Sequence, residues 1–181
     1  MIYTEITPNP ASLKFVTDRL LIKKGTADFE SLEVAEDAPI VQKLFDFRFT
    51  ERVFIGKNFI TLTKGEDFSW EEVIPSVKAF LKAYFDSAQP VLTGKYEVLE
   101  EEVVEKSELE KKICDTLDQY IRPAVAQDGG DIIYQGFEDG VVKLRMQGSC
   151  SGCPSSTLTL KAGIEGLLTR MIPEVKEVVA V

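Results

Sequence analysis

The stretch GSCSGCPSS, residues 148–156, decides how the C-terminal part of this sequence folds. It follows a run of strand character and precedes a run with helical spacing, so we expect it at a strand-to-helix junction. Gly152 allows a tight turn between Cys150 and Cys153, and Pro154 suits the first turn of the helix, where no N–H is needed. The free N–H groups at that helix start favour thiolate, the form that binds soft metals and iron–sulfur clusters. The stretch therefore predicts a metal or redox site.

The residues around this stretch predict an α-β-β-α-β unit with a three-stranded mixed sheet. Ser107 and Glu110 form a capping box before the first helix, and Asp-Gly-Gly-Asp at 128–131 ends that helix. Strands are expected at 132–137 and 141–146, followed by a helix at 154–170 and a last strand at 175–181. The helical residues expected to face the core are Leu109, Ile113, Leu117, Tyr120 and Ile121, then Leu160, Ile164, Leu167, Leu168 and Met171.

The N-terminal part predicts a second α+β domain of a different kind. Ten of the eleven Phe lie in residues 1–89, whereas all three Cys lie beyond residue 113. A helix is expected to start after Ser69, whose capping box with Glu72 precedes apolar residues at helical spacing. A shorter helix is expected at 39–45. Short β-branched or aromatic runs predict strands at 13–16, 20–22, 52–55 and 59–63, the last two as a hairpin.

The fold class is therefore α+β, with two small domains at residues 1–89 and 107–181. Residues 90–106 are expected to be a linker, because they contain an acidic run from Glu97 to Glu105 with three consecutive Glu. Such a run is typical of a solvated segment.

Composition excludes several classes of function. A formal net charge of -9 makes nucleic acid a poor partner. No stretch approaches the roughly 20 apolar residues of a membrane span, and the first residues have no signal-peptide character, which predicts a cytoplasmic protein without a membrane partner. An imported eukaryotic protein whose presequence has been removed would look similar. The absence of His excludes His-based catalytic triads and imidazole-ligated metals, and three Cys are too few for a disulfide scaffold.

The number of thiols predicts a dimer. A zinc site or an iron–sulfur cluster usually takes four protein ligands, and the pair Cys150 and Cys153 supplies two. The remaining thiol, Cys114, lies beside Ile113 in the first C-terminal helix, and we interpret it as a buried small hydrophobe. A two-fold dimer that pairs the two motif cysteines of each chain gives four thiolates around one exposed cluster.

Other interpretations of the cysteine pair stay open at this point. A dithiol–disulfide oxidoreductase would form a reversible disulfide, although a thioredoxin-like fold needs more sheet and helix after the motif than this sequence has. A zinc-bound interaction module would need the same dimer as a cluster. Asp128 and Asp131 could be interpreted as a pair of metal ligands. Beside two glycines, however, they are expected to hydrogen-bond their own turn.

These motifs, taken in order, resemble the C-terminal domain of NifU, also called the Nfu domain. The resemblance rests on residues 117, 120–123, 128–131, 148–156, 158–161 and 172–175. Residues 7–15 and 54–64 are similar to the N-terminal domain of Nfu-type proteins, so the resemblance covers nearly the whole chain.

The resemblance implies an iron–sulfur cluster scaffold or carrier and not an enzyme. It implies a 4Fe–4S cluster held between two subunits by Cys150 and Cys153, with Cys114 outside the ligand set. The implied partners are apo iron–sulfur proteins as clients, upstream cluster assembly proteins, and a second copy of the chain when the cluster is bound. The domain at 1–89, which has no Cys, is then a client- or partner-recognition module.

Overall fold

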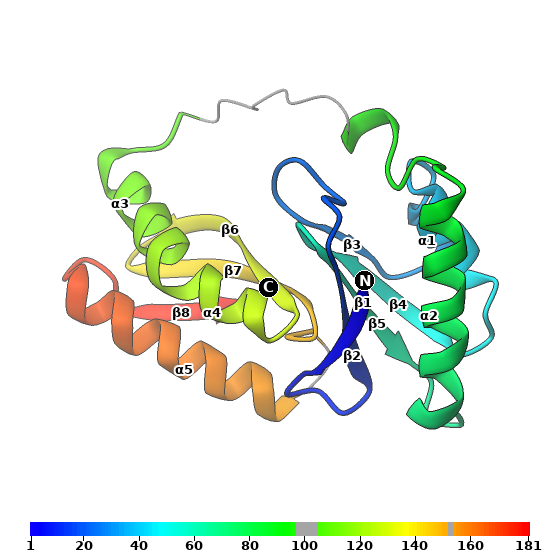
Figure 1. The fold of residues 1–181 in the computed structure, drawn as a ribbon. Helices are drawn as coiled ribbons and strands as arrows, with labels where there is room; N and C mark the ends of the chain where they lie inside the picture. Colours follow the sequence, from blue (N-terminus) through cyan, green and yellow to red (C-terminus); the bar gives the residue numbers. More distant parts are fainter. Residues whose placement is uncertain (97–104, 152–153) are drawn as a thin grey trace. The chain divides into compact units, whose positions relative to one another are not determined.

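The computed structural model describes residues 1–96, 105–151 and 154–181 (Figure 1). These residues form two compact units, Met1–Glu100 and Glu101–Val181. Both units combine helices with a sheet, which confirms the α+β class.

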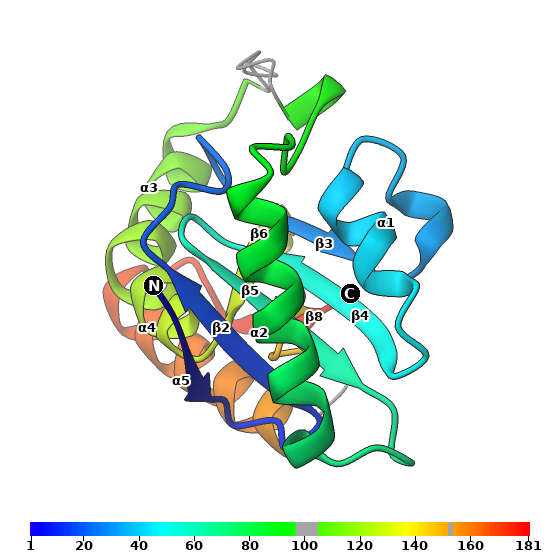
Figure 2. The same cartoon turned by 45° about the vertical axis from the view of Figure 1, so that its right-hand side comes forward.

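Residues 1–96 of the N-terminal unit form a five-stranded antiparallel sheet in the order β1-β2-β5-β4-β3. Its helices α1 and α2 lie on one face of that sheet (Figure 2). The strands and helices, in chain order, are β1 (Ile2–Ile6), β2 (Ser12–Thr17), β3 (Ala27–Phe29), the 3-10 turn η1 (Leu32–Val34), α1 (Pro39–Phe45), β4 (Thr50–Ile55), β5 (Phe59–Lys64), α2 (Trp70–Asp86) and the 3-10 turn η2 (Gly94–Tyr96).

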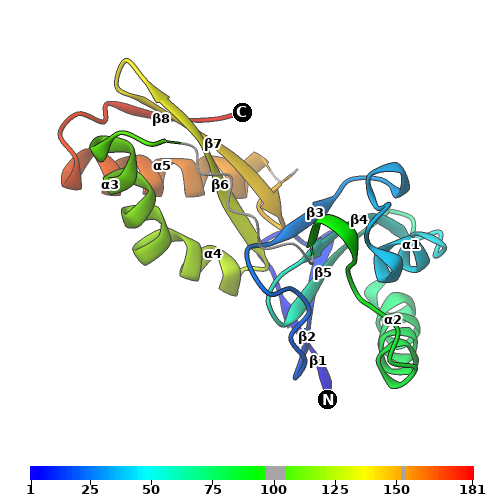
Figure 3. The same cartoon turned by 90° about the horizontal axis from the view of Figure 1, so that it is seen from above.

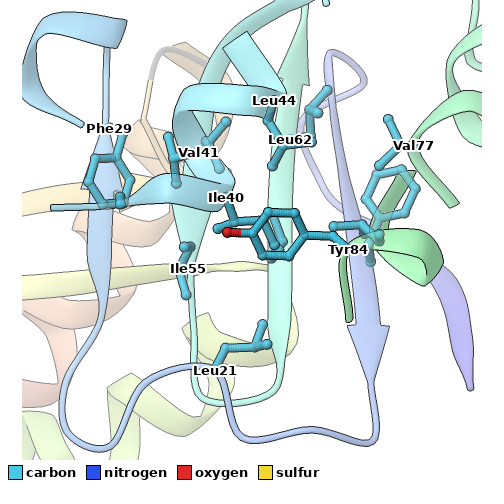
Figure 4. Close-up of a cluster of buried hydrophobic side chains, with 14 of the residues drawn as sticks. Leu21, Phe29, Ile40, Val41, Leu44, Ile55, Leu62, Val77 and Tyr84 are labelled. Atoms are coloured by element: carbon cyan, nitrogen blue, oxygen red, sulfur yellow. The ribbon is translucent and has the colours of Figure 1, made fainter. Parts of the chain in front are cut away.

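Helix α2 begins where its capping box predicts. The backbone N–H of Ser69 donates to Glu72 Oε2 at 3.2 Å, which satisfies an otherwise unpaired donor at the helix start. From there the helix packs Val77 and Tyr84 onto the sheet, beside α1 (Figure 4). The helix therefore covers the strands with the face that its apolar spacing defines.

One predicted strand is wrong and two strands escaped prediction. Residues 20–22 are not in a strand, although Leu21 and Ile22 are buried in the core of the unit. Their apolar character serves packing, and the N–H of Leu21 bonds the carbonyl of Lys57 at 2.8 Å outside any ladder. The unpredicted strands are β1 and β3, of which β3 has only three residues and so carries no periodic pattern.

Part of the predicted linker packs against the N-terminal unit. Leu92 is buried in its core, and the Tyr96 ring meets the Phe29 ring edge-on at a centroid distance of 5.9 Å. Most of the acidic run lies outside the described residues, and the linker assignment stays a prediction.

The C-terminal unit has the predicted order of elements, with one helical irregularity. The elements in chain order are α3 (Glu108–Thr116), the π-helical turn η3 (Leu117–Ile121), α4 (Arg122–Gln127), β6 (Gly130–Glu138), β7 (Val141–Gly148), α5 (Pro154–Met171) and β8 (Glu177–Ala180). The first predicted helix is thus divided, and the π-helical turn ends just before Pro123, which has no N–H to continue the α-helical bonding.

The described part of this unit contains a three-stranded mixed sheet, as predicted. Strand β7 pairs antiparallel with β6 and parallel with β8. Figure 3 shows α3, α4 and α5 on one face of this sheet. The expectation that Tyr120 and Met171 face the core is wrong, because these side chains are 49% and 39% exposed. Tyr120 lies within the π-helical turn, whose wider winding rotates side chains away from an α-helical register.

Candidate functional site

The cysteine motif lies between β7 and α5, the predicted strand-to-helix junction. Strand β7 ends at Gly148, whose φ of 66° is a left-handed conformation that favours glycine. Cys150 follows two residues later, and α5 begins at Pro154. Gly152 and Cys153 lie outside the described residues, so the second expected ligand has no structural account.

A tight turn from a distant part of the sequence supports Cys150. The β6–β7 register pairs Gly130 with Gly148, which brings the 128–131 segment beside the cysteine loop. The N–H of Ser149 donates to the carbonyl of Gly129 at 3.3 Å. The Ser149 hydroxyl donates to the carbonyl of Asp128. These bonds hold the residue just before Cys150 at two points.

Gly130 lies against the side chain of the expected ligand Cys150. A Cβ atom at this position would lie 2.7 Å from Cys150 Sγ and 2.7 Å from the carbonyl oxygen of Gln147. Because the Gln147 oxygen belongs to the backbone, it could not move aside as a flexible side chain would. The absence of a side chain at Gly130 is therefore what lets the Cys150 sulfur lie against β6.

Cys150 is a member of the hydrophobic core of its unit. It is 6% exposed and lies in one cluster with residues such as Met146 and Ile164. Burial raises the pKa of its thiol to about 11, and the nearby carboxylates of Asp128 and Asp131 act in the same direction. Burial therefore opposes the ionisation of this thiol that the start of α5 is expected to favour.

The α5 side of the junction supplies one more anchor. The Thr157 hydroxyl donates to the carbonyl of Cys150 at 3.0 Å. The cysteine loop is thus bonded both to the turn before β6 and to the first turns of α5.

Asp131 of the 128–131 turn has a structural role. Asp131 accepts two hydrogen bonds from Arg122, at 3.0 Å to each carboxylate oxygen, and one from the N–H of Ile132 at 2.8 Å. The Arg122 pKa is raised, chiefly by the hydrogen bonds to Asp131. Among the residues that the structure describes, no group of three or more Cys, Asp or Glu side chains could hold a metal ion. For Asp131, this arrangement agrees with the interpretation that the aspartate orders its own turn.

Cys114 does not have its expected place in the core. It is half-buried in α3, next to the fully buried Ile113. Its sulfur accepts a hydrogen bond from Lys106 Nζ at 3.4 Å. Burial raises the pKa of this thiol, while Lys106 opposes the rise. The Cys114 side chain therefore lies at the margin of the core, where it contacts a polar group. It is not a small hydrophobe within the core.

Sequence reasoning missed the residues that position Cys150. Gly130, Ser149 and Thr157 contact the cysteine loop, yet only the pair of glycines at 129–130 gave a signal, and that signal predicted a helix end. A strand register was needed to bring residues 128–131 to the motif.

Two family models together match most of the chain. Residues 2–88 match the model described as scaffold protein Nfu/NifU N terminal, and residues 113–179 match the NifU-like domain. The NFU1 iron-sulfur cluster scaffold homolog, mitochondrial, of Homo sapiens is 42% identical over 98% of this chain and 70% of its own length. The chain belongs to the Nfu/NifU family.

Other Nfu/NifU relatives are similar over the same range. NifU-like protein 4, mitochondrial, of Arabidopsis thaliana is 41% identical over 98% of this chain and 64% of its own length. The NFU1 homolog of Drosophila ananassae is 43% identical over 98% of this chain and 63% of its own length. The chain thus spans about two thirds of the length of these relatives.

The names of these relatives correct one expectation from the sequence. All three are named as mitochondrial, which overturns the prediction of a cytoplasmic protein. The signal-peptide and membrane-span criteria could not reveal a mitochondrial location, because neither of them distinguishes a mitochondrial protein from a cytoplasmic one. Within the described residues, no helix has the length and apolar character needed to cross a membrane.

Proposed function

We propose that this chain binds an iron–sulfur cluster through Cys150 and Cys153 and delivers it to apo-proteins. The observation that carries the proposal is the position of Cys150, held by three hydrogen bonds of its loop at a strand-to-helix junction. Thiolate sulfur is the ligand type that iron–sulfur clusters take in proteins. The relatives from Homo sapiens and Drosophila ananassae are named as iron-sulfur cluster scaffold homologs, which supports the same function here.

The bound form we propose is a 4Fe–4S cluster between two subunits. The motif offers two thiols per chain, and a cluster of this type takes four. Cys114 does not complete the set, because its sulfur accepts a hydrogen bond from Lys106 and a third thiol would still leave one ligand position unfilled. A second copy of the chain supplies the missing pair, in a two-fold arrangement.

The burial of Cys150 suits a carrier better than a permanent holder. This side chain packs in the C-terminal core, so a favourable apolar place is open to it when it does not bind a cluster. For transfer, a thiolate of the receiving protein takes the iron position that a motif cysteine leaves. The exchange replaces one iron–sulfur bond by another and changes no oxidation state.

Anaerobic reconstitution of the full chain with iron and sulfide tests this proposal. We expect Mössbauer parameters of a 4Fe–4S cluster, together with a shift from monomer to dimer in size exclusion. The Cys150→Ala/Cys153→Ala double variant is expected to lose the cluster, whereas the matched Cys114→Ala variant is expected to load normally. A monomer without cluster absorption, or a cluster retained by the double variant, would overturn the assignment.

The same sample separates the alternatives. Zinc without any visible chromophore would identify a zinc-bound interaction module. A reversible Cys150–Cys153 disulfide with catalytic reduction of insulin would identify a dithiol–disulfide oxidoreductase.

A further inference from the structure

The N-terminal unit contains a cavity between its edge strand and its long helix. The cavity has a volume of about 520 Å³ and is lined from β1, from the end of β2 and from the second half of α2. This volume lies within the range of roughly 300–1,000 Å³ that is usual for ligand pockets. Ile2 and Phe85 give it apolar walls.

The rim of this cavity is cationic. Lys78 and Lys82 line it from successive turns of α2, and neither has an ion-pair partner among the residues that the structure describes. Arg19 is fixed at the opposite side, because its Nη1 donates to the carbonyl of Phe85 at 3.0 Å and its guanidinium lies 5.5 Å from the Phe85 ring centre.

The two carboxylates at the cavity do not cancel this charge. The lining has two carboxylates, Asp18 and Asp86, and three basic side chains, so its net charge stays positive. A basic cavity is unusual on a chain whose formal net charge is -9. It favours a partner of opposite charge.

The strand beside the cavity has a free edge. Strand β1 is at the end of the sheet order and, within the described residues, pairs only with β2. Natural sheets protect such edges with Lys, Pro or β-bulges. Strand β1 has no Lys or Pro, and its one charged residue, Glu5, pairs with Lys14 of β2 at 3.0 Å. Its register with β2 is unbroken, and Ile6 is 88% exposed. The main chain of β1 is therefore available for pairing with another strand.

We propose that this edge and cavity form a docking site for an extended acidic segment of a partner protein. The segment adds as a strand beside β1, where main-chain hydrogen bonds give affinity. Because alternate side chains of a strand point to one face, those on the α2 side reach the cavity. An apolar side chain contacts Phe85 and Ile2, and carboxylates meet Lys78 and Lys82. This site lies in the unit without cysteines and is separate from the proposed cluster function.

Binding of short fluorescent peptides to the full chain tests the charge and the main-chain parts of the proposal. The probe is a peptide of alternating Glu and Val, compared by fluorescence anisotropy with an otherwise equal Lys–Val peptide. A third peptide has the Glu–Val sequence with N-methyl groups on alternate amides, which block strand pairing. We expect the unmodified Glu–Val peptide to bind at least about tenfold more tightly than either of the others.

A charge-reversed variant locates the site. Lys78→Glu/Lys82→Glu is expected to weaken Glu–Val binding by about tenfold or more, because two attractions become repulsions. Lys111→Glu/Lys112→Glu is the matched control, since it makes the same change in charge on exposed residues of α3, and it is expected to change binding by less than about twofold. Fluorescence of Trp70 reports whether the N-terminal unit of each variant is folded.

Three results would overturn the docking site. They are equal binding of the Glu–Val and Lys–Val peptides, equal binding of the N-methylated peptide, and full binding by a folded Lys78→Glu/Lys82→Glu variant. Absence of any peptide binding would mean that the edge is covered, by a second copy or by another part of this chain, and would overturn it too. Cluster loading, measured on the same variants, is expected to stay unchanged and reports the proposed cluster function independently.

Discussion

The hydrophobic cores of the two units differ in whether they contain an expected cluster ligand. The N-terminal core is built of large side chains, such as the fully buried Phe15 and Phe29, and contains no thiol. The C-terminal core is smaller and includes Cys150 as one of its members. In the C-terminal unit, the contacts that form the core therefore also position the expected ligand. In the N-terminal unit, the core contains no expected ligand.

This difference predicts that core substitutions affect cluster loading in one unit and not in the other. Loosening the C-terminal core moves the Cys150 sulfur, because the same contacts that bury it also position it. Loosening the N-terminal core changes only the stability of that unit and of what docks on it. Substitutions in the two cores should therefore have different effects on cluster loading.

The largest effect expected is that of Phe29→Ala. Phe29 is 0% exposed, and truncating a buried Phe to Ala costs about 3–5 kcal/mol in the free energy of unfolding. Urea denaturation followed by fluorescence of Trp70, the single Trp, reports the N-terminal unit and measures this loss. Cluster loading under native conditions is expected to remain.

Ile164→Ala is the counterpart in the C-terminal core. Ile164 is also 0% exposed and shares a cluster with Cys150. The expected loss is about 2–5 kcal/mol, accompanied by reduced cluster loading. Equal loading by the two variants would contradict the link between core packing and ligand position.

The sequence predicts most of the fold where local patterns are long. Helix α2 and the β4–β5 hairpin agree with prediction because each combines periodicity with a capping box or a turn. Strand β3 escaped because it is too short, and residues 20–22 misled because a buried loop can be as apolar as a strand. The cysteine loop was located from the motif alone. Its support by Gly130 was not, because the contact depends on a strand register that joins residues far apart in sequence.

Asp131→Asn is expected to have a smaller effect than either core truncation. This carboxylate is 5% exposed as a side chain and accepts both Arg122 hydrogen bonds, which tie α4 to the start of β6. Hydrogen bonds to charged groups contribute about 1.5–3 kcal/mol, and the partial exposure of Arg122 puts the expected loss at the lower end. Thermal unfolding followed by near-ultraviolet circular dichroism measures it, with Trp70 fluorescence recorded in parallel to identify the transition of the N-terminal unit. Lys143→Gln, which removes the exposed pair with Glu138, is the control and should change stability by less than about 1 kcal/mol.

Gly130→Ala tests the contact between β6 and the cysteine loop. The added methyl group would meet both Cys150 Sγ and a backbone oxygen at 2.7 Å, so we expect a loss of about 1–3 kcal/mol and weaker cluster loading. Gly163→Ala is the matched control, because a Cβ there meets nothing within 4 Å. In the interior of α5 that change should stabilise by about 0.5–1 kcal/mol. A Gly130→Ala variant that loads clusters as well as Gly163→Ala would show that the contact does not position the ligand.

The smallest effect concerns the thiol outside the core, Cys114. Burial raises its pKa, and the ammonium of Lys106 lowers it by charge and by a hydrogen bond. Lys106→Met removes the opposing influence, so the pKa rises further and less thiolate is present at a given pH. In the Cys150→Ala/Cys153→Ala background, where Cys114 is the only thiol, alkylation at pH 8 is expected to slow by about threefold. Lys111→Met, which removes an equal charge that pairs with Glu108 instead, should leave the rate unchanged. If both variants react alike, Lys106 does not act on the thiol, and the half-buried place of Cys114 in α3 alone determines its reactivity.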